Sequence, residues 1–287
     1  MTDKLNTEPL NTGRLQENAE AIYRVRAHNT ATDSENKIHD DEVAARYGFH
    51  GGLVPGVTIF AYMTEAIVSR FPEWLEQGSM QVKFQRPFYE DDIVCVRAEV
   101  NAEEMPIRLS VRAEKEDGEV CAVGTVVVKD ESNFLGEPRL EDYPTGALPK
   151  PAERPAATRE IFIVGTPLGS LEKKIDLEEQ QAAYLKAIEE RLSFYYGDDA
   201  VAHPGYLLGL ANEIFVRNFM VSPWIHAGSE FQNYSTVRHD ETLSVRGRIR
   251  ETYERKGFEF VVLDILAVAN ETRPVQQIRH TAVYKFR

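Results

Sequence analysis

The decapeptide YGFHGGLVPG, residues 47–56, decides the fold because the chain carries a second version of it, YGDDAVAHPG, at residues 196–205. Each version is followed by an apolar segment with the pattern of a helix, VTIFAYMTEAIVSRF in the first case and YLLGLANEIFVRNFM in the second. An internal repeat of this kind predicts two copies of one structural unit. The residues that match between the copies are Tyr47 with Tyr196, Gly48 with Gly197, Pro55 with Pro204, and Gly56 with Gly205.

The similarity between the copies continues beyond these helices. Trp74 and Trp224, the only two tryptophans of the chain, align in register, and several β-rich runs follow each of them. Between the copies lies a segment rich in proline and charge, a composition typical of a linker. The predicted parts of the chain are a polar N-terminal tail at 1–19, a first half at 20–131, a linker at 132–157 and a second half at 158–287.

Each half reads as one long helix and a run of antiparallel strands. The apolar text after each decapeptide lacks strand alternation and predicts a buried helix, and the proline before it suits the first helical turn. The sequences EDG at 116–118 and ERKG at 254–257 predict hairpin turns between strands. A helix and a sheet of this kind form an α+β unit in which the sheet wraps around the helix.

Composition excludes several classes of protein. A formal net charge of −13 argues against nucleic-acid binding, which needs a basic footprint. The sequence has no apolar run near the ~18 residues of a membrane span, and its polar start predicts no secretory signal. Cys95 and Cys121, the only cysteines, lie in strand-like runs. They predict buried reduced thiols, and hence a cytoplasmic protein with no metal site.

Three features together resemble one known family. They are the helix-plus-strand repeat, the sequence FQRPFYEDDIVCV at 84–96, and NKIHDDEVAA at 36–45 before GGLVPG at 51–56. In these features the chain is similar to the MaoC-like hydratase/dehydratase family in its double-hotdog form. The resemblance implies an α+β double hotdog, two tandem units that each wrap an antiparallel sheet around a long central helix. It also implies a hydro-lyase that acts on enoyl or 3-hydroxyacyl thioesters of CoA or pantetheine, with no metal or redox cofactor. Pairing of two chains is common in the family, so the resemblance allows a homodimer and leaves the oligomeric state open.

The family motif can be followed residue by residue in the first half alone. The positions that match it are Asn36, Ile38, His39 and Ala45. Ser34 stands where the family has its catalytic aspartate, and Asp33 lies one residue earlier. The resemblance implies that Asp33 and His39 hold one water as an acid–base pair, supported by Ser34 and Asn36. The alternative is that this segment is a polar turn that caps the helix after it.

Two residues of the first predicted helix lead to further hypotheses. Backbone N–H groups at the helix start near Gly56 can polarise a thioester oxygen; the alternative is that Gly56 only allows a tight turn. Glu65 lies in the middle of the helix, where a carboxylate is costly unless it is paired. Glu65 is either the base of a hotdog thioesterase or a group that meets polar neighbours between the halves. A non-catalytic hotdog that binds a small hydrophobic ligand is the third hypothesis.

Overall fold

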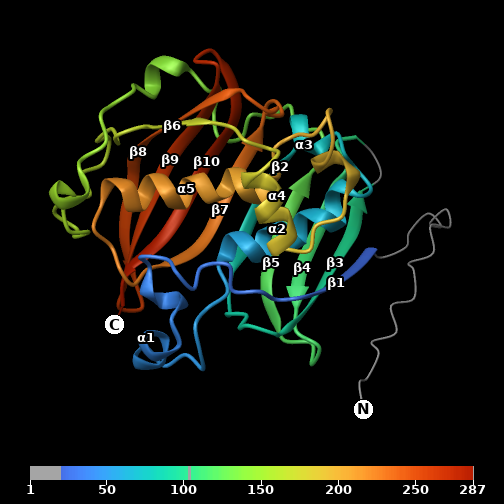
Figure 1. Cartoon of the computed structure of the whole chain (residues 1–287), viewed down its shortest axis with the longest axis horizontal. Helices are drawn as coiled ribbons and strands as arrows, with labels where there is room; N and C mark the ends of the chain where they lie inside the picture. The colour runs from blue at the N-terminus through green and yellow to red at the C-terminus, as the bar shows by residue number, and fades with distance from the viewer. Residues whose placement is uncertain (1–20, 103–104, 287) are drawn as a thin grey trace.

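A single antiparallel sheet of ten strands forms the body of the protein (Figure 1). The computed structural model describes residues 21–102 and 105–286, so the predicted tail at 1–19 lies outside the described part. The strands are β1 (Ala21–Arg26), β2 (Ser79–Phe84), β3 (Ile93–Ala102), β4 (Arg108–Glu114), β5 (Val120–Val127), β6 (Leu171–Lys174), β7 (Ile225–Asn233), β8 (Thr242–Arg255), β9 (Phe258–Ala269) and β10 (Arg273–Lys285). The α-helices are α1 (Asp41–Arg46), α2 (Gly56–Val68), α3 (Trp74–Gln77), α4 (Gln180–Ala187) and α5 (Pro204–Asn218).

The strand order shows the repeat directly. The first half runs β1-β3-β4-β5-β2, and the second half runs the same order in reverse, β7-β10-β9-β8-β6. The halves join where β2 pairs with β7, with Met80 opposite Phe231. Because these two strands are antiparallel, the halves are related by an approximate twofold axis. One sheet therefore continues through both halves.

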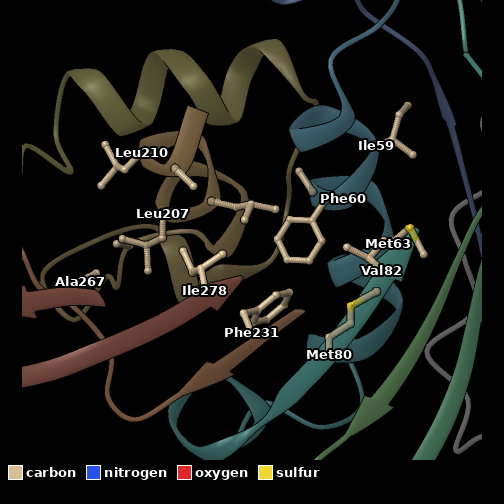
Figure 2. Packing of buried hydrophobic residues seen from close by; sticks show 14 of the residues in the cluster. Ile59, Phe60, Met63, Met80, Val82, Leu207, Leu210, Phe231, Ala267 and Ile278 are labelled. Atoms are coloured by element: carbon tan, nitrogen blue, oxygen red, sulfur yellow. The ribbon is translucent and has the colours of Figure 1, made fainter. Parts of the chain in front are cut away.

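The two long helices lie side by side across one face of the sheet (Figure 1). Ten of the 13 residues of α2 are buried, as expected for a helix that is apolar on nearly all sides. Figure 2 shows Phe60 of α2 directed at Phe231 of β7, and their rings meet edge to face with centroids 5.2 Å apart. The packing of α2 and α5 thus places the start of each helix near residues of the other half. No helix among residues 21–102 and 105–286 is long and apolar enough to cross a membrane.

Local sequence signals explain the turns and the linker. Gly118 between β4 and β5 has φ +85°, and Gly257 between β8 and β9 has φ +82°. This backbone conformation is easy for glycine and strained for other residues, so both predicted hairpins are present. Residues 132–157 form two short 3-10 turns and no strand. Cys95 and Cys121 are free, buried thiols on β3 and β5, as predicted.

Candidate functional site

A cavity of about 200 Å³ lies at the start of α2. Its walls come from the loop before α1, the start of α2, the residues that follow β2, and the second half. The lining residues include Asn36, His39, Gly56, Phe84, Trp224 and His226. The two halves therefore build one site together, and most of its remaining lining is apolar.

In the described part of the chain, the start of α2 leaves a backbone donor without a partner at a residue that lines this cavity. Pro55 is the N-cap residue of α2 and makes no side-chain capping bond. The first N–H groups of any helix have no acceptor within the helix. For Gly56, the structure gives no acceptor among residues 21–102 and 105–286. Since Gly56 lines the cavity, its N–H group is available to an oxygen atom of a ligand.

At the equivalent start of α5, by contrast, the backbone N–H group already has an acceptor. His203 is the N-cap residue there, and its Nδ1 accepts a hydrogen bond of 2.9 Å from the N–H group of Gly205. Nε2 of His203 lies 3.2 Å from Oε2 of Glu190, and both residues are buried. Burial lowers the pKa of His203 and outweighs its contact with Glu190, so the imidazole is neutral. The approximate twofold symmetry of the fold is thus broken at the helix starts.

Asn36 ties the predicted catalytic loop to the second half. Its Nδ2 donates to the carbonyl of Trp224 at 2.9 Å, and its Oδ1 accepts from the N–H group of Trp224 at 3.0 Å. Asn36 is 5% exposed, so both bonds are shielded from water. Asn36 also begins the short 3-10 turn Lys37–His39 that carries the histidine. A side chain predicted to support the loop therefore fixes the position of His39.

The hydrogen bonds of His39 define its protonation. Nδ1 lies 2.7 Å from the carbonyl oxygen of Leu53, and a carbonyl can only accept, so Nδ1 carries a proton. Burial lowers the pKa of His39, and the bond to Leu53 opposes this shift only in part. The ring is therefore neutral near pH 7, with a lone pair on Nε2. Nε2 accepts a long hydrogen bond of 3.3 Å from Nδ2 of Asn36, and this bond has to be exchanged for one with water before Nε2 can take a proton from it. A neutral, oriented imidazole of this kind is suited to act as a general base.

The structure does not bring Asp33 together with His39. Asp33 is exposed and does not line the cavity. Ser34, which stands at the family's aspartate position, uses its Oγ to accept from the N–H group of Asn36 at 3.0 Å. The segment thus forms a self-bonded polar turn, and Asp40 caps α1 by accepting from Val43 at 3.0 Å. These bonds of Ser34 and Asp40 agree with the alternative interpretation of the segment as a polar, capping turn.

Glu65 also lies outside the cavity. Burial, and next the negative charge of Glu190, raises the pKa of Glu65 to about 7. Glu65 in turn raises the pKa of Tyr23, after the larger effect of burial. Glu190 belongs to the second half, whereas Tyr23 lies on β1 at the outer edge of the first half, so a contact of Glu65 with polar groups between the halves stays a prediction. A thioesterase mechanism based on Glu65 would therefore need a site other than the cavity that His39 lines.

Replacing Glu65 by glutamine should stabilise the protein above pH 7. The pKa is about 7 in the folded state against 4.5 for an ordinary glutamate, so stability is lost as pH rises from 4.5 through 7. Glutamine removes this cost, and we expect a gain of roughly 1–3 kcal/mol at pH 8 and less at pH 5. Urea unfolding of both proteins at the two pH values measures it. Glu76→Gln, at an exposed position, is the control, and an equal effect of Glu65→Gln at both pH values would contradict the burial argument.

Sequence reasoning missed the contribution of the second half to this cavity. The second half contributes Trp224 and His226 to the cavity wall. Trp224 directly precedes β7, and His226 lies within β7. The repeat placed Trp224 opposite Trp74, but it gave His226 no counterpart of similar chemistry. The described residues 21–102 and 105–286 contain no cluster of three His, Cys, Asp or Glu side chains that could hold a metal ion.

Comparison with known proteins agrees with the geometry at the level of the fold. No family model and no curated protein sequence matches the chain. A putative MaoC domain protein dehydratase from Chloroflexus aurantiacus superposes with a TM-score of 0.67 at 10% identity, covering 99% of this chain and 100% of the other. A conserved hypothetical protein from Mycobacterium tuberculosis with a double hotdog fold gives 0.60 at 15% identity, covering 94% and 96%. A putative oleoyl thioesterase from Lactobacillus plantarum gives 0.54 at 10% identity, covering 95% and 99%.

These likenesses identify the fold as a double hotdog, as the sequence predicts. Structures with this architecture include proteins named as MaoC-like dehydratases and as thioesterases. At 10–15% identity the fold is shared, whereas the reaction depends on the individual site. The fold therefore leaves the dehydratase, thioesterase and ligand-binding hypotheses open.

Proposed function

We propose that this chain hydrates a short enoyl thioester, or dehydrates the matching 3-hydroxyacyl thioester, in the cavity at the start of α2. The observation that carries the proposal is the combination of a neutral His39 and the open N–H group of Gly56 on the same cavity. The first supplies a base and the second stabilises negative charge on the thioester oxygen. The substrate is a CoA or pantetheine thioester.

The proposed reaction needs one base and one site for negative charge. The oxygen of a water molecule attacks the β-carbon, while a proton of that water passes to Nε2 of His39. The electron pair of the carbon–carbon double bond moves onto the thioester oxygen, which the N–H group of Gly56 stabilises. The imidazolium of His39 then returns its proton to the α-carbon, which restores the carbonyl. Asp33 has no part in these steps because its carboxylate lies outside the cavity.

The size of the cavity supports a short acyl group. A volume of about 200 Å³ equals roughly six or seven water molecules at ~30 Å³ each. A four-carbon enoyl group fits within this volume, whereas a long fatty-acyl chain would have to extend beyond it. Much of the lining is apolar, as Ile38, Leu53 and Ile59 illustrate, and suits the hydrocarbon part of such a group.

A pair of assays tests the proposed reaction against thioester hydrolysis. With crotonyl-CoA, the wild-type protein should remove the ultraviolet absorbance of the conjugated enoyl group. With butanoyl-CoA, it should release no free thiol. Thiol release without loss of enoyl absorbance would assign the cavity to a thioesterase. The absence of both reactions across several chain lengths would favour a protein that only binds a small ligand.

Turnover should depend on pH through His39. Burial holds the pKa of His39 below its ordinary value of 6.5, and only the neutral ring accepts the proton of water. We therefore expect kcat/KM for hydration to be constant from about pH 7 upward through weakly alkaline pH, and to fall as pH drops below 6.5. A pH profile of initial rates measures this dependence. A rate that increases as pH falls through this range would contradict a neutral histidine base.

A further inference from the structure

A chain of three buried polar residues forms part of the second half behind the cavity. Nε2 of His226 lies 2.9 Å from Oγ of Ser229, and the same Oγ lies 3.3 Å from Nδ1 of His280. His226 is 6% exposed, Ser229 2% and His280 0%. The mechanism above uses none of them. Buried polar groups in a row are costly unless their hydrogen bonds are satisfied, so the ends of this chain that lack a partner are informative.

Among the described residues, this chain has two ends without a hydrogen-bond partner, Nε2 of His280 and Nδ1 of His226, and the second lies against the start of α2. A Cβ atom built on Gly56 would lie 3.1 Å from Nδ1 of His226. Nδ1 is buried and has no hydrogen-bond partner among the described residues. The nearby carbonyl of Gly228 favours a proton on the ring but makes no hydrogen bond with Nδ1. An imidazole nitrogen without a partner therefore lies against Gly56, and both residues line the cavity.

The ring of His226 is neutral, so its one N–H proton is either on Nδ1 or on Nε2. Burial, and next the neighbouring His280, holds the pKa of His226 well below its ordinary value, and burial lowers the pKa of His280 to about 3. Both rings are therefore neutral. If the hydroxyl of Ser229 donates to Nε2 of His226, Nδ1 carries the proton and is a donor. If the hydroxyl donates to His280, Nδ1 of His226 is an acceptor.

A bound thioester oxygen distinguishes these two arrangements. The oxygen can only accept, so it selects the arrangement in which Nδ1 of His226 donates. In this arrangement Nδ1–H of His280 donates to Ser229, and Ser229 donates to Nε2 of His226. Every bond of the chain then has one donor and one acceptor. A neutral imidazole that donates to an oxygen can polarise a carbonyl without becoming charged.

We propose that His226 is a catalytic residue that donates Nδ1–H to the thioester oxygen and forms, with the N–H group of Gly56, a two-donor oxyanion site. Ser229 and His280 are positioning residues that keep the proton of His226 on Nδ1. This inference rests on the proposed function, because it assumes that the thioester oxygen lies at Gly56. It assigns to the second half a direct role in the reaction, although that half lacks the family motif.

Enolate formation in bound acetoacetyl-CoA tests this inference without requiring turnover. Two donors at the thioester oxygen should stabilise the enolate, so its ultraviolet band should titrate at lower pH in the complex than in free ligand. His226→Phe removes the donor and should raise the midpoint of that titration by roughly 1–2 pH units, a 10- to 100-fold loss of enolate. His226→Gln retains an N–H donor and should recover part of the loss. Ser229→Ala should raise the midpoint by a smaller amount.

The controls separate this inference from the proposed function. Ser244→Ala makes the same substitution at another buried strand serine and should leave the midpoint unchanged. If His226→Phe is unstable, His226→Gln and Ser229→Ala still give the comparison. An unchanged midpoint in these variants, a wild-type complex without the enolate band, or no binding of acetoacetyl-CoA would overturn the inference. If the band behaves as expected while crotonyl-CoA is not hydrated, the oxyanion site stands and the hydratase proposal fails.

Discussion

His39→Ala should lower kcat for hydration of a short enoyl thioester by 10²-fold or more. The expectation follows from general-base catalysis, which contributes roughly 10²- to 10⁴-fold, and from the lone pair on Nε2 that the bond between Nδ1 and Leu53 defines. The fold should remain intact because the loop is still fixed by the bonds between Asn36 and Trp224. Steady-state kinetics with crotonyl-CoA, together with circular dichroism of the variant, measures both effects.

A nearby histidine provides the control for this substitution. His50 is exposed and does not line the cavity, so His50→Ala should keep kcat within a factor of about two, as expected for surface substitutions away from a site. A wild-type rate in His39→Ala would remove His39 from the reaction. Equal losses in the two variants would point to a general disturbance of the loop instead of a missing base.

Gly56→Ala should reduce kcat by on the order of 10²- to 10³-fold, the loss expected when an oxyanion donor is blocked. The added Cβ would lie 3.1 Å from Nδ1 of His226 and 3.1 Å from Cε2 of Phe84. Both distances are shorter than ordinary van der Waals contact, so His226 and Phe84 would have to shift at the helix start where we propose that the thioester oxygen binds. KM should change less than kcat, because the oxyanion develops in the transition state. Kinetics with crotonyl-CoA provides the measurement.

The second long helix offers a matched glycine. Gly209 lies within α5, and a Cβ there would meet nothing within 4 Å. Gly209→Ala should therefore stabilise the protein by roughly 0.5–1 kcal/mol, because alanine is the better helix former, and leave kcat unchanged. If Gly56→Ala retains wild-type kcat, the N–H group of Gly56 is not the oxyanion donor. If Gly209→Ala lowers kcat as much, helix distortion explains both losses.

Much of the fold could be predicted because the sequence contains it twice. Tyr47 to Gly56 and their counterparts Tyr196 to Gly205 mark the two helix starts. The glycines at the hairpin turns and the apolar segments of the two long helices are local sequence signals, and the structure has turns and helices where they predict them. The pairing of β2 with β7, which joins the halves into one sheet, is not visible in the sequence. Strand pairing over such a separation depends on tertiary packing and leaves no local pattern.

The site was less accessible to prediction. The family motif located His39 and Asn36, and both line the cavity. The motif also suggested Asp33, but a shift of one residue changes the direction of a side chain, and the local bonds of Ser34 and Asn36 leave Asp33 exposed. The approach of His226 to Gly56 depends on how the halves pack. It gave no signal in the sequence because His226 lies far from the motif and has no equivalent in the repeat.

The position of a bound thioester tests the central claim most directly. A crystal structure with an unreactive analogue of crotonyl-CoA, in which a methylene group replaces the thioester sulfur, would show where the carbonyl lies. We expect the carbonyl oxygen within hydrogen-bonding distance of the N–H group of Gly56, and the β-carbon on the side of Nε2 of His39. An analogue bound outside the cavity, or bound with its carbonyl turned away from Gly56, would contradict the proposed site.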